Sequence, residues 1–149
     1  ERNLSMAFNA IRVQNPSFQC KVQNNLAQNL ADVKIVTADI GRVLLNIFNN
    51  AFQAMDEKKI SAGSEYSPLL TITTTSKNGK IILTIRDNGV GIPEQVKDMI
   101  FEPFFTTKPS GQGTGLGLSI SNEIIKSHNG EMVVDSIQNE FTQFTIVLG

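Results

Sequence analysis

The sequence predicts an α/β domain of two layers, in which a mixed, mostly antiparallel sheet is packed against about three helices. Residues 38–58 carry a broad apolar stripe at helical spacing. Residues 70–86 and 132–148 each contain two β-rich segments separated by a short turn. The chain has 149 residues, which suits one domain and allows about two thirds of the unfolded surface to be buried.

The first part of the chain is expected to form one helix and two short strands. Apolar residues recur about once per helical turn over residues 1–13, which predicts the helix. Asn15-Pro16 ends it, because the residue before a proline is pushed out of the helical region. Alternating apolar and polar side chains predict a strand over 18–22, and a second short strand is expected over 33–36.

The long helix over 38–58 is expected to begin at a side-chain cap, either Thr37 or Asp39. One of its faces is broadly apolar and should pack on the sheet. That face consists of Ile40, Val43, Leu44, Ile47, Phe48, Ala51 and Met55.

Strands are predicted over 70–75 and 81–86, joined around Asn78-Gly79, because an Asn-Gly pair between β-rich runs is a strong hairpin signal. A loop follows over 87–91. Pro93 then suits the first position of a short helix over 93–99.

The last third begins with residues 101–114, which hold two prolines and two glycines and are expected to be a mobile loop. Helical spacing resumes over 115–126. Asn129 and Gly130 suit a left-handed end of that helix. Segments 132–137 and 141–148 are expected to form a closing hairpin.

The composition excludes several classes of function. The chain has 13 Lys and Arg against 14 Asp and Glu, which argues against a strongly basic surface for nucleic acid. One His and one Cys cannot make a Cys/His zinc site, and triad chemistry would have to use His128. Cys20 has no internal disulfide partner, which suits a reducing compartment. No apolar run approaches the ~20 residues of a membrane span. Because the sequence starts at Glu1 rather than Met, we expect a processed product or an excised fragment.

Asn46 and Asn50 lie four residues apart and so share one face of the long helix. Asn is a mediocre helix former, so a polar face built from it has some cost. The plain interpretation is a solvated face. The functional interpretation is that an amide oxygen serves as one hard ligand of Mg²⁺, whose other ligands come from phosphates and water.

Glycine-bearing loops supply two further candidate sites. Asp87 with Gly89 and Gly91 follows a strand; this is either an ordinary turn or a pocket whose carboxylate accepts a hydrogen bond from the adenine amine. Four glycines alternate over residues 111–117, where backbone N–H groups can surround phosphate oxygens. Lys108, just upstream, either adds a charge-assisted contact or is a solvated loop lysine.

Phe101, Phe104 and Phe105 form an apolar cluster in an otherwise polar segment. One interpretation is a plug that fixes the loop on the core. The other is a lid hinge that responds to nucleotide.

Taken in order, these segments resemble four boxes of the catalytic and ATP-binding (HATPase_c) domain of bacterial sensor histidine kinases, in the GHKL superfamily. Residues 39–55 (DIGRVLLNIFNNAFQAM) resemble the N box and 87–93 (DNGVGIP) the G1 box. Residues 101–108 (FEPFFTTK) resemble the F box and 111–120 (GQGTGLGLSI) the G2 box. Gyrase-type topoisomerases and mismatch-repair ATPases share the superfamily, but FEPFFTTK followed by GTGLGLSI favours the kinases.

The resemblance implies a Bergerat-type α/β sandwich that binds ATP and Mg²⁺. Asn50 would be the metal ligand and Asn46 would help to hold the phosphates, while Asp87 would bind adenine in a pocket shaped by Gly89 and Gly91. Lys108 would act with Asn46 and Asn50 in catalysis. The triphosphate would also meet the G2 segment at Gly111, Gly113, Thr114, Gly115, Leu116 and Gly117.

The same resemblance implies a parent kinase that moves the γ-phosphoryl group of ATP to a histidine on a separate dimerisation domain, with a response regulator downstream. His128 precedes Asn-Gly at a helix end, so we expect it to be structural. Residues 1–15 would be a remnant of the connection to the dimerisation domain, and 16–149 the ATP-binding domain. A cytoplasmic location is expected, without nucleic-acid or direct membrane contact, and membrane anchoring of the parent is left open.

Two other classes stay open. A gyrase-like or mismatch-repair-like ATPase would need a catalytic Glu on the long helix, where the nearest is Glu57 at its far end. A non-catalytic interaction module would not need Asn50, Asp87 and all four G2 glycines.

Overall fold

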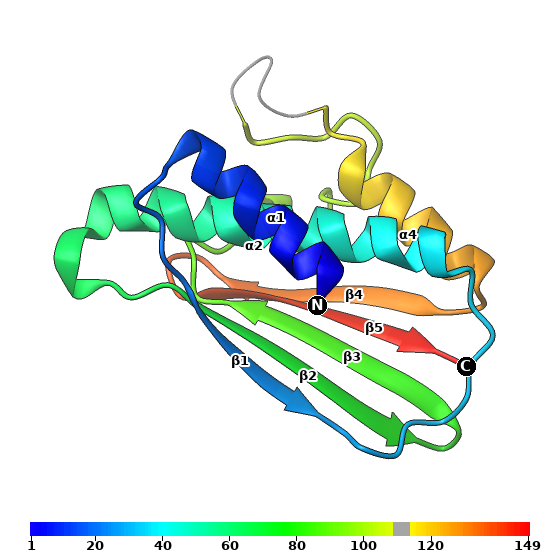
Figure 1. The fold of residues 1–149 in the computed structure, drawn as a ribbon. Coiled ribbons are helices and arrows are strands. Elements are labelled where there is room, and N and C mark those ends of the chain that lie inside the picture. The colour runs from blue at the N-terminus through cyan, green and yellow to red at the C-terminus, as the bar shows by residue number, and fades with distance from the viewer. Residues whose placement is uncertain (109–113) are drawn as a thin grey trace.

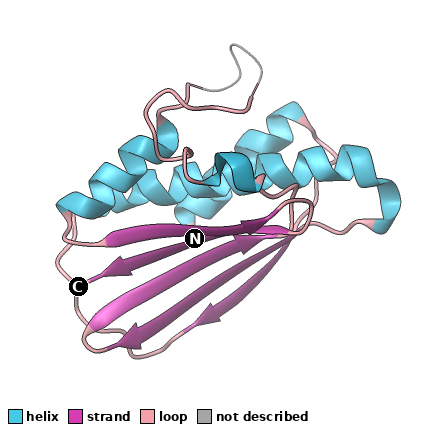
Figure 2. Ribbon diagram, turned by 180° about the vertical axis from the view of Figure 1, so that it is seen from behind, coloured by secondary structure: helices cyan, strands magenta, loops and turns pink. Residues whose placement is uncertain are grey.

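In the computed structural model, which describes residues 1–108 and 114–149, helices cover one face of a five-stranded sheet (Figure 1). This architecture confirms the predicted two-layer α/β class. The same two layers are visible from behind in Figure 2. The elements in chain order are α1 (Arg2–Gln14), β1 (Lys21–Leu26), α2 (Thr37–Ala62), the 3-10 turn η1 (Gly63–Glu65), β2 (Leu69–Lys77), β3 (Lys80–Asp87), α3 (Glu94–Lys97), α4 (Gly117–Ser127), β4 (Glu131–Ile137) and β5 (Phe141–Leu148).

The sheet is mixed, with the strand order β1-β2-β3-β5-β4. β1 pairs with β2 in parallel, and the other neighbouring pairs are antiparallel. The β2–β3 turn has left-handed backbone at Asn78 (φ 53°) and Gly79 (φ 77°), as a two-residue hairpin turn requires. The predicted Asn-Gly hairpin is therefore confirmed.

The core lies between α2 and the sheet. α2 buries its predicted apolar face apart from Leu44, which is half-buried, and also buries Phe52, which was not predicted. α1 and α4 pack against α2. Phe52 is fully buried and contacts the rings of Phe8 and Phe18, with centroids 5.6 and 6.0 Å away. Edge-to-face contacts between aromatic rings stabilise the core beyond the burial of their surface. These contacts fix α2, which carries the candidate asparagines.

The strands predicted over 18–22 and 33–36 are corrected by the structure. Pairing begins at Lys21, opposite Leu69 of β2, and continues to Leu26, whereas Phe18 is buried in the aromatic cluster before the strand starts. The second prediction is wrong, because residues 33–36 lie outside the sheet. The N–H of Val36 instead donates to the His128 ring, 3.0 Å away.

The ends of α2 and α3 differ from the ends predicted from the sequence. α2 begins at Thr37 without a side-chain cap bond, so neither Thr37 nor Asp39 is the predicted cap. Asp39 instead sits in the first turn, where the helix dipole favours a negative charge. α3 ends at Lys97 and is shorter than predicted.

The end of α4 agrees with prediction. Asn129 is left-handed (φ 55°), and the Gly130 N–H donates to the Ile125 carbonyl at 2.9 Å. The His128 ring lies 2.8 Å from the Ile124 carbonyl through Nδ1, while its Nε2 accepts from Val36. A neutral ring with the proton on Nδ1 satisfies both bonds. His128 therefore ties α4 to the start of α2, in agreement with its predicted structural role.

α1 shares the core of the sheet domain, because Ala7 and Ile11 are buried against it. The predicted origin of residues 1–15 in a connection to a dimerisation domain stays a prediction. Over the described ranges, no helix combines the length and the apolar character that a membrane crossing needs.

Candidate functional site

Asn46, Asn50 and Gln53 lie along one stripe of α2, since steps of four and three residues bring side chains to the same helix face. All three are half-buried. Asn46 Nδ2 donates to Ser121 Oγ of α4 at 3.2 Å, and Ser121 Oγ donates in turn to the Gly117 carbonyl at 2.8 Å. This chain of bonds fixes the Asn46 amide at the point where α2 meets the first turn of α4.

Gly117 is the first residue of α4 and touches this amide. A Cβ atom at Gly117 would collide with Asn46 Oδ1. The absence of a side chain therefore lets the start of α4 approach α2 closely. The start of an 11-residue helix, where the backbone N–H groups are unpaired, thus lies against the asparagine stripe.

A hollow of about 260 Å³ lies between α2 and α4. Its lining includes Arg42, Asn46, Gly117 and Ser121. It combines amide, hydroxyl and guanidinium groups, which suits a polar ligand. A larger hollow of about 450 Å³ is lined by α4 and Pro103, is mainly apolar and includes Leu116 alone of the predicted site residues.

Asp87 ends β3 and is buried, with 4% of its surface exposed. Its carboxylate accepts a hydrogen bond of 2.9 Å from the Gly89 N–H. Burial raises the pKa of Asp87 to about 7, and the Gly89 hydrogen bond and the charge of Lys58 oppose that rise. A buried carboxylate that accepts from few donors is suited to take a further hydrogen bond from a ligand amine.

The glycines after Asp87 are required by close packing. A Cβ at Gly89 would lie 2.7 Å from the Ala54 carbonyl carbon on α2. Gly91 has φ 67°, and a Cβ there would collide with the Ile137 carbonyl at the end of β4. The loop after Asp87 is thus held between α2 and the β4–β5 hairpin.

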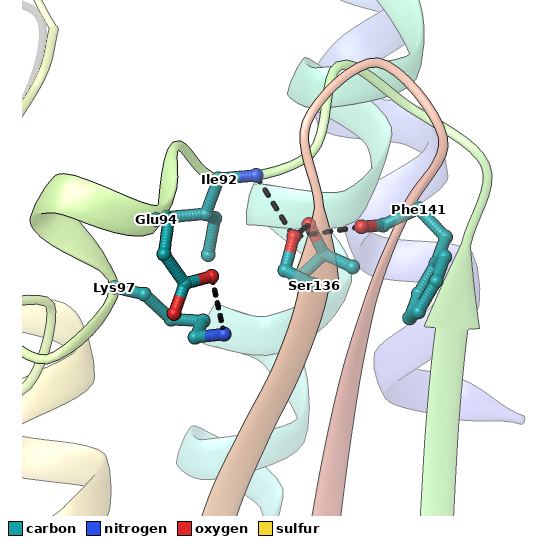
Figure 3. A network of polar contacts seen from close by, with 6 residues as sticks. Ile92, Glu94, Lys97, Ser136 and Phe141 are labelled. Carbon is teal, nitrogen blue, oxygen red and sulfur yellow. Dashed lines mark hydrogen bonds and ion pairs between the residues drawn. The ribbon is translucent and has the colours of Figure 1, made fainter.

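Sequence reasoning missed Ser136, whose hydroxyl holds the end of this loop at Ile92. Ser136 Oγ accepts from the Ile92 N–H at 2.8 Å and donates to the Phe141 carbonyl at 2.7 Å (Figure 3). The Asn139 N–H donates to the Val90 carbonyl at 2.6 Å. No local pattern pairs residues about 45 positions apart, so only a tertiary structure could reveal these contacts.

Asn88 was also missed, although it stands inside the recognised segment. Its Oδ1 accepts from Tyr66 Oη and from the Leu69 N–H, both at 2.8 Å, and its Nδ2 donates to the Ser67 carbonyl at 2.9 Å. Lys58 Nζ donates to the Asn88 carbonyl at 2.9 Å. These bonds fasten the loop to the start of β2 and to α2.

Lys108 reaches back to α2. Its Nζ donates a hydrogen bond to Gln53 Oε1, and both residues are half-buried. Burial lowers the pKa of Lys108, while Glu57 one turn further along α2 acts against that change. The structure therefore brings the predicted lysine to the asparagine stripe.

The phenylalanine cluster divides into two kinds. Phe101 and Phe105 pack against the core, and the Phe101 ring lies 6.4 Å from that of Phe144. Phe104 is 75% exposed and left-handed (φ 66°). The plug interpretation therefore holds for the first two residues and not for Phe104.

Gly115, with φ 67°, lets the described part of the G2 segment approach Phe104 closely, because a Cβ at Gly115 would collide with the Phe104 backbone. The Leu116 N–H donates to Thr114 Oγ1 at 3.3 Å. Gly111 and Gly113 lie outside the described residues, so their predicted contacts stay predictions.

The donor set suits a magnesium ion that arrives with a phosphate ligand. Asn50 offers one hard, neutral oxygen. Within residues 1–108 and 114–149, no group of three or more His, Cys, Asp or Glu side chains could hold a metal ion. Mg²⁺ commonly takes few protein ligands and completes its shell with phosphate oxygens and water.

The model of the histidine kinase-, DNA gyrase B-, and HSP90-like ATPase family (HATPase_c) matches residues 35–149. The chain belongs to this family. Among curated proteins, this HATPase_c chain is 34% identical over 140 residues to the signal transduction histidine-protein kinase AtoS of Escherichia coli (strain K12), covering 93% of the chain and 21% of AtoS. It is 38% identical over 126 residues to the sensor kinase CckA of Brucella abortus, covering 78% of the chain and 13% of CckA.

Solved structures agree with this assignment. The HATPase_c chain superposes on the catalytic domain of histidine kinase ThkA, in a nucleotide-free form, with a TM-score of 0.74 and 27% identity, covering 99% of this chain and 90% of the other. Full-length ShkA in complex with AMPPNP shares the fold at a TM-score of 0.75 and 18% identity, covering 98% and 29%. The predicted resemblance is confirmed: this is a catalytic and ATP-binding domain of the sensor histidine kinase type.

Proposed function

We propose that this HATPase_c domain binds ATP with its adenine amine on Asp87, and that a longer parent kinase uses the bound nucleotide to phosphorylate a histidine. The observation that carries the proposal is the buried Asp87 carboxylate, 4% exposed and held by the Gly89 N–H. The chain spans 21% of AtoS and 13% of CckA, which leaves ample length for other domains in such parents.

The carboxylate gives a reason for choosing adenine. The exocyclic amine of adenine donates to a carboxylate, whereas guanine presents a carbonyl oxygen at the corresponding place. Two acceptors facing each other in a buried pocket are unfavourable. Asp87 should therefore favour ATP and ADP over GTP and GDP.

The phosphates would extend from this pocket toward the α2 stripe and the start of α4. Asn46, Lys108 and the first backbone N–H groups of α4 would hold phosphate oxygens. Asn50 would contribute one ligand to Mg²⁺, which neutralises charge on the phosphates when it is bound. Positioning of the terminal phosphoryl group is then the main catalytic task of the domain.

The acceptor histidine would belong to a separate dimerisation domain of the parent. His128 is held at both ring nitrogens, by contacts with Ile124 and Val36, and so is poorly placed to attack a phosphoryl group. A response regulator would receive the group afterwards. A cytoplasmic place follows from the need for ATP, and anchoring of the parent in a membrane is compatible with it.

Calorimetric titration of the 149-residue chain with ATP, ADP, GTP and GDP in the presence of Mg²⁺ tests the nucleotide part. Adenine nucleotides should bind at least about tenfold more tightly than guanine nucleotides. Equal affinities would remove Asp87 from base selection, and no binding of any nucleotide would defeat the proposal.

Incubation with γ-labelled ATP tests the transfer. The chain alone should gain no stable label. Addition of a histidine-bearing dimerisation domain of the parent kinase should place label on that domain. Stable label on the chain itself would contradict the assignment of the acceptor to another domain.

A further inference from the structure

Gln53 is the residue of the α2 stripe to which the sequence assigns no function, and it holds the Lys108 ammonium. Its amide oxygen accepts the hydrogen bond from Lys108 Nζ. Gln53 follows Asn50 by three residues, so both side chains project from the same face of α2. The lysine is therefore fastened next to the residues that would hold phosphate and metal.

The chemistry of the tether suits a cation that must stay available to a ligand. An ammonium group has three donors, and the bond to Gln53 uses one of them. An amide acceptor is neutral, so it orients the ammonium without cancelling its charge. A carboxylate in the same place would neutralise that charge. Burial lowers the pKa of Lys108, which indicates that its charge is partly removed from water before a ligand enters.

The segment that leads to the lysine is attached to the core. The Lys108 N–H donates to Thr106 Oγ1 at 3.1 Å, and Phe105 packs against the core. The lysine stem thus leaves an anchored segment, and Gln53 fixes its far end. A side chain held at both ends loses less conformational freedom when it binds a ligand.

We propose that Gln53 is a positioning residue, which fixes Lys108 over the asparagine stripe of α2 so that its ammonium meets the phosphate chain of the nucleotide. This inference rests on the proposed function. It adds a specific role to a glutamine that contacts the lysine and need not contact the nucleotide.

Binding of AMP, ADP and ATP distinguishes two roles for Gln53, positioning of the Lys108 ammonium and general support of the fold. Gln53→Leu should weaken ATP binding by about threefold to tenfold and ADP binding by less, because the ammonium is no longer oriented. AMP binding should stay within about twofold, since Asp87 and its loop are untouched. Calorimetry with Mg²⁺ present measures each affinity, and thermal unfolding verifies that each variant folds.

A double-mutant cycle tests whether Gln53 acts through Lys108. Lys108→Met should weaken ATP binding more than Gln53→Leu does, and adding Gln53→Leu to it should cause little further loss. Gln143→Leu is the matched control, because the Gln143 amide oxygen accepts from Arg86 Nη1 at 3.4 Å at a distance from α2. Its nucleotide affinities should equal those of the unmodified chain.

Each other outcome overturns the proposal. Equal losses for AMP, ADP and ATP would show that Gln53 only supports the fold, and additive losses in the cycle would show that it acts without Lys108. Tighter ATP binding by Gln53→Leu would show that the tether competes with phosphate. Failure of the unmodified chain to bind any nucleotide would instead defeat the proposed function, and so the two failures are distinguishable.

Discussion

The side-chain amide of Asn46 donates a hydrogen bond to Ser121 Oγ across the α2–α4 contact, at 3.2 Å. Ser121 is buried, with 2% of its surface exposed, and its hydroxyl donates a hydrogen bond to the Gly117 carbonyl. The bond to Ser121 thus uses one of the two N–H donors of the Asn46 amide. Its oxygen is held against the first residue of that helix, and the two helices are set in one arrangement relative to the proposed phosphate site.

Gly117→Ala should disturb the site more than the fold. The new methyl group collides with Asn46 Oδ1, so the amide must rotate and give up its bond to Ser121. Alanine also favours helix over glycine by about 1 kcal/mol, which offsets part of the strain. We expect the free energy of unfolding to change by at most about 1 kcal/mol and Mg-ATP affinity to fall about tenfold.

Gly41→Ala provides the control for a glycine within a helix. A Cβ there lies 3.3 Å from Asn3 Nδ2, the free end of a side chain that can move aside. Denaturant unfolding should show a small change, and calorimetry should show unchanged nucleotide affinity. An unchanged ATP affinity in Gly117→Ala would disprove the role of the Asn46 orientation.

The fold could be predicted because its local signals agree with its tertiary contacts. The Asn78-Gly79 turn, the apolar face of α2 and the Asn129-Gly130 helix end each have a short-range cause. Residues 33–36 were wrongly predicted as a strand because their β-branched side chains are typical of strands. Their backbone forms no sheet pairing in the structure. Val36 donates to His128, 92 positions away, which no local pattern contains.

Gly91→Ala should be among the most damaging substitutions in the loop that follows Asp87. It combines left-handed backbone, φ 67°, with a collision of the new methyl group and the Ile137 carbonyl. Gly79→Ala has comparable backbone, φ 77°, and open space around the added atom. Left-handed strain costs each variant about 1–2 kcal/mol. The collision occurs only at Gly91, so Gly91→Ala should lose about 2 kcal/mol more of the free energy of unfolding than Gly79→Ala in denaturant. Equal losses would show that the hairpin does not support the loop.

Sequence reasoning pointed to the candidate site through its recognised segments, whose binding roles stay predictions. It missed the residues whose roles depend on distant partners. Asp87 and the glycines stand in a short pattern that becomes specific together with the other three boxes. Ser136 and Gln53 gain their roles from a loop and a lysine placed there by the fold. Side chains that orient other side chains leave little trace in a single sequence.

Folding stability should depend on the pH through Asp87. Its pKa is raised by burial from 3.8 to about 7, so the folded state binds a proton in the pH range where the unfolded state has released it. Stability should therefore rise as the pH falls from about 7 toward 4, by at most about 1.4 kcal/mol per pH unit from this group. Unfolding curves of the unmodified chain and Asp87→Asn, compared at each pH, isolate the contribution. Parallel pH profiles would contradict it.

His128→Phe should destabilise the domain without preventing the proposed phosphoryl transfer to a dimerisation domain. The change removes the acceptor of the Val36 N–H and the contact of Nδ1 with the Ile124 carbonyl. A loss of about 1–3 kcal/mol in the free energy of unfolding is expected. Label from γ-labelled ATP should still reach a separate dimerisation domain at a temperature where the variant is folded. Loss of transfer by a folded variant would assign His128 a direct role.

The central claim is that the buried Asp87 carboxylate binds the adenine base, and calorimetric titration of Asp87→Asn with Mg-ADP tests it most directly. Asp135→Asn, an exposed aspartate on β4, is the matched control. We expect ADP affinity to fall at least about tenfold in Asp87→Asn and to be unchanged in Asp135→Asn, with both variants folded by thermal unfolding. A folded Asp87→Asn variant that binds ADP as tightly as the unmodified chain would contradict the claim.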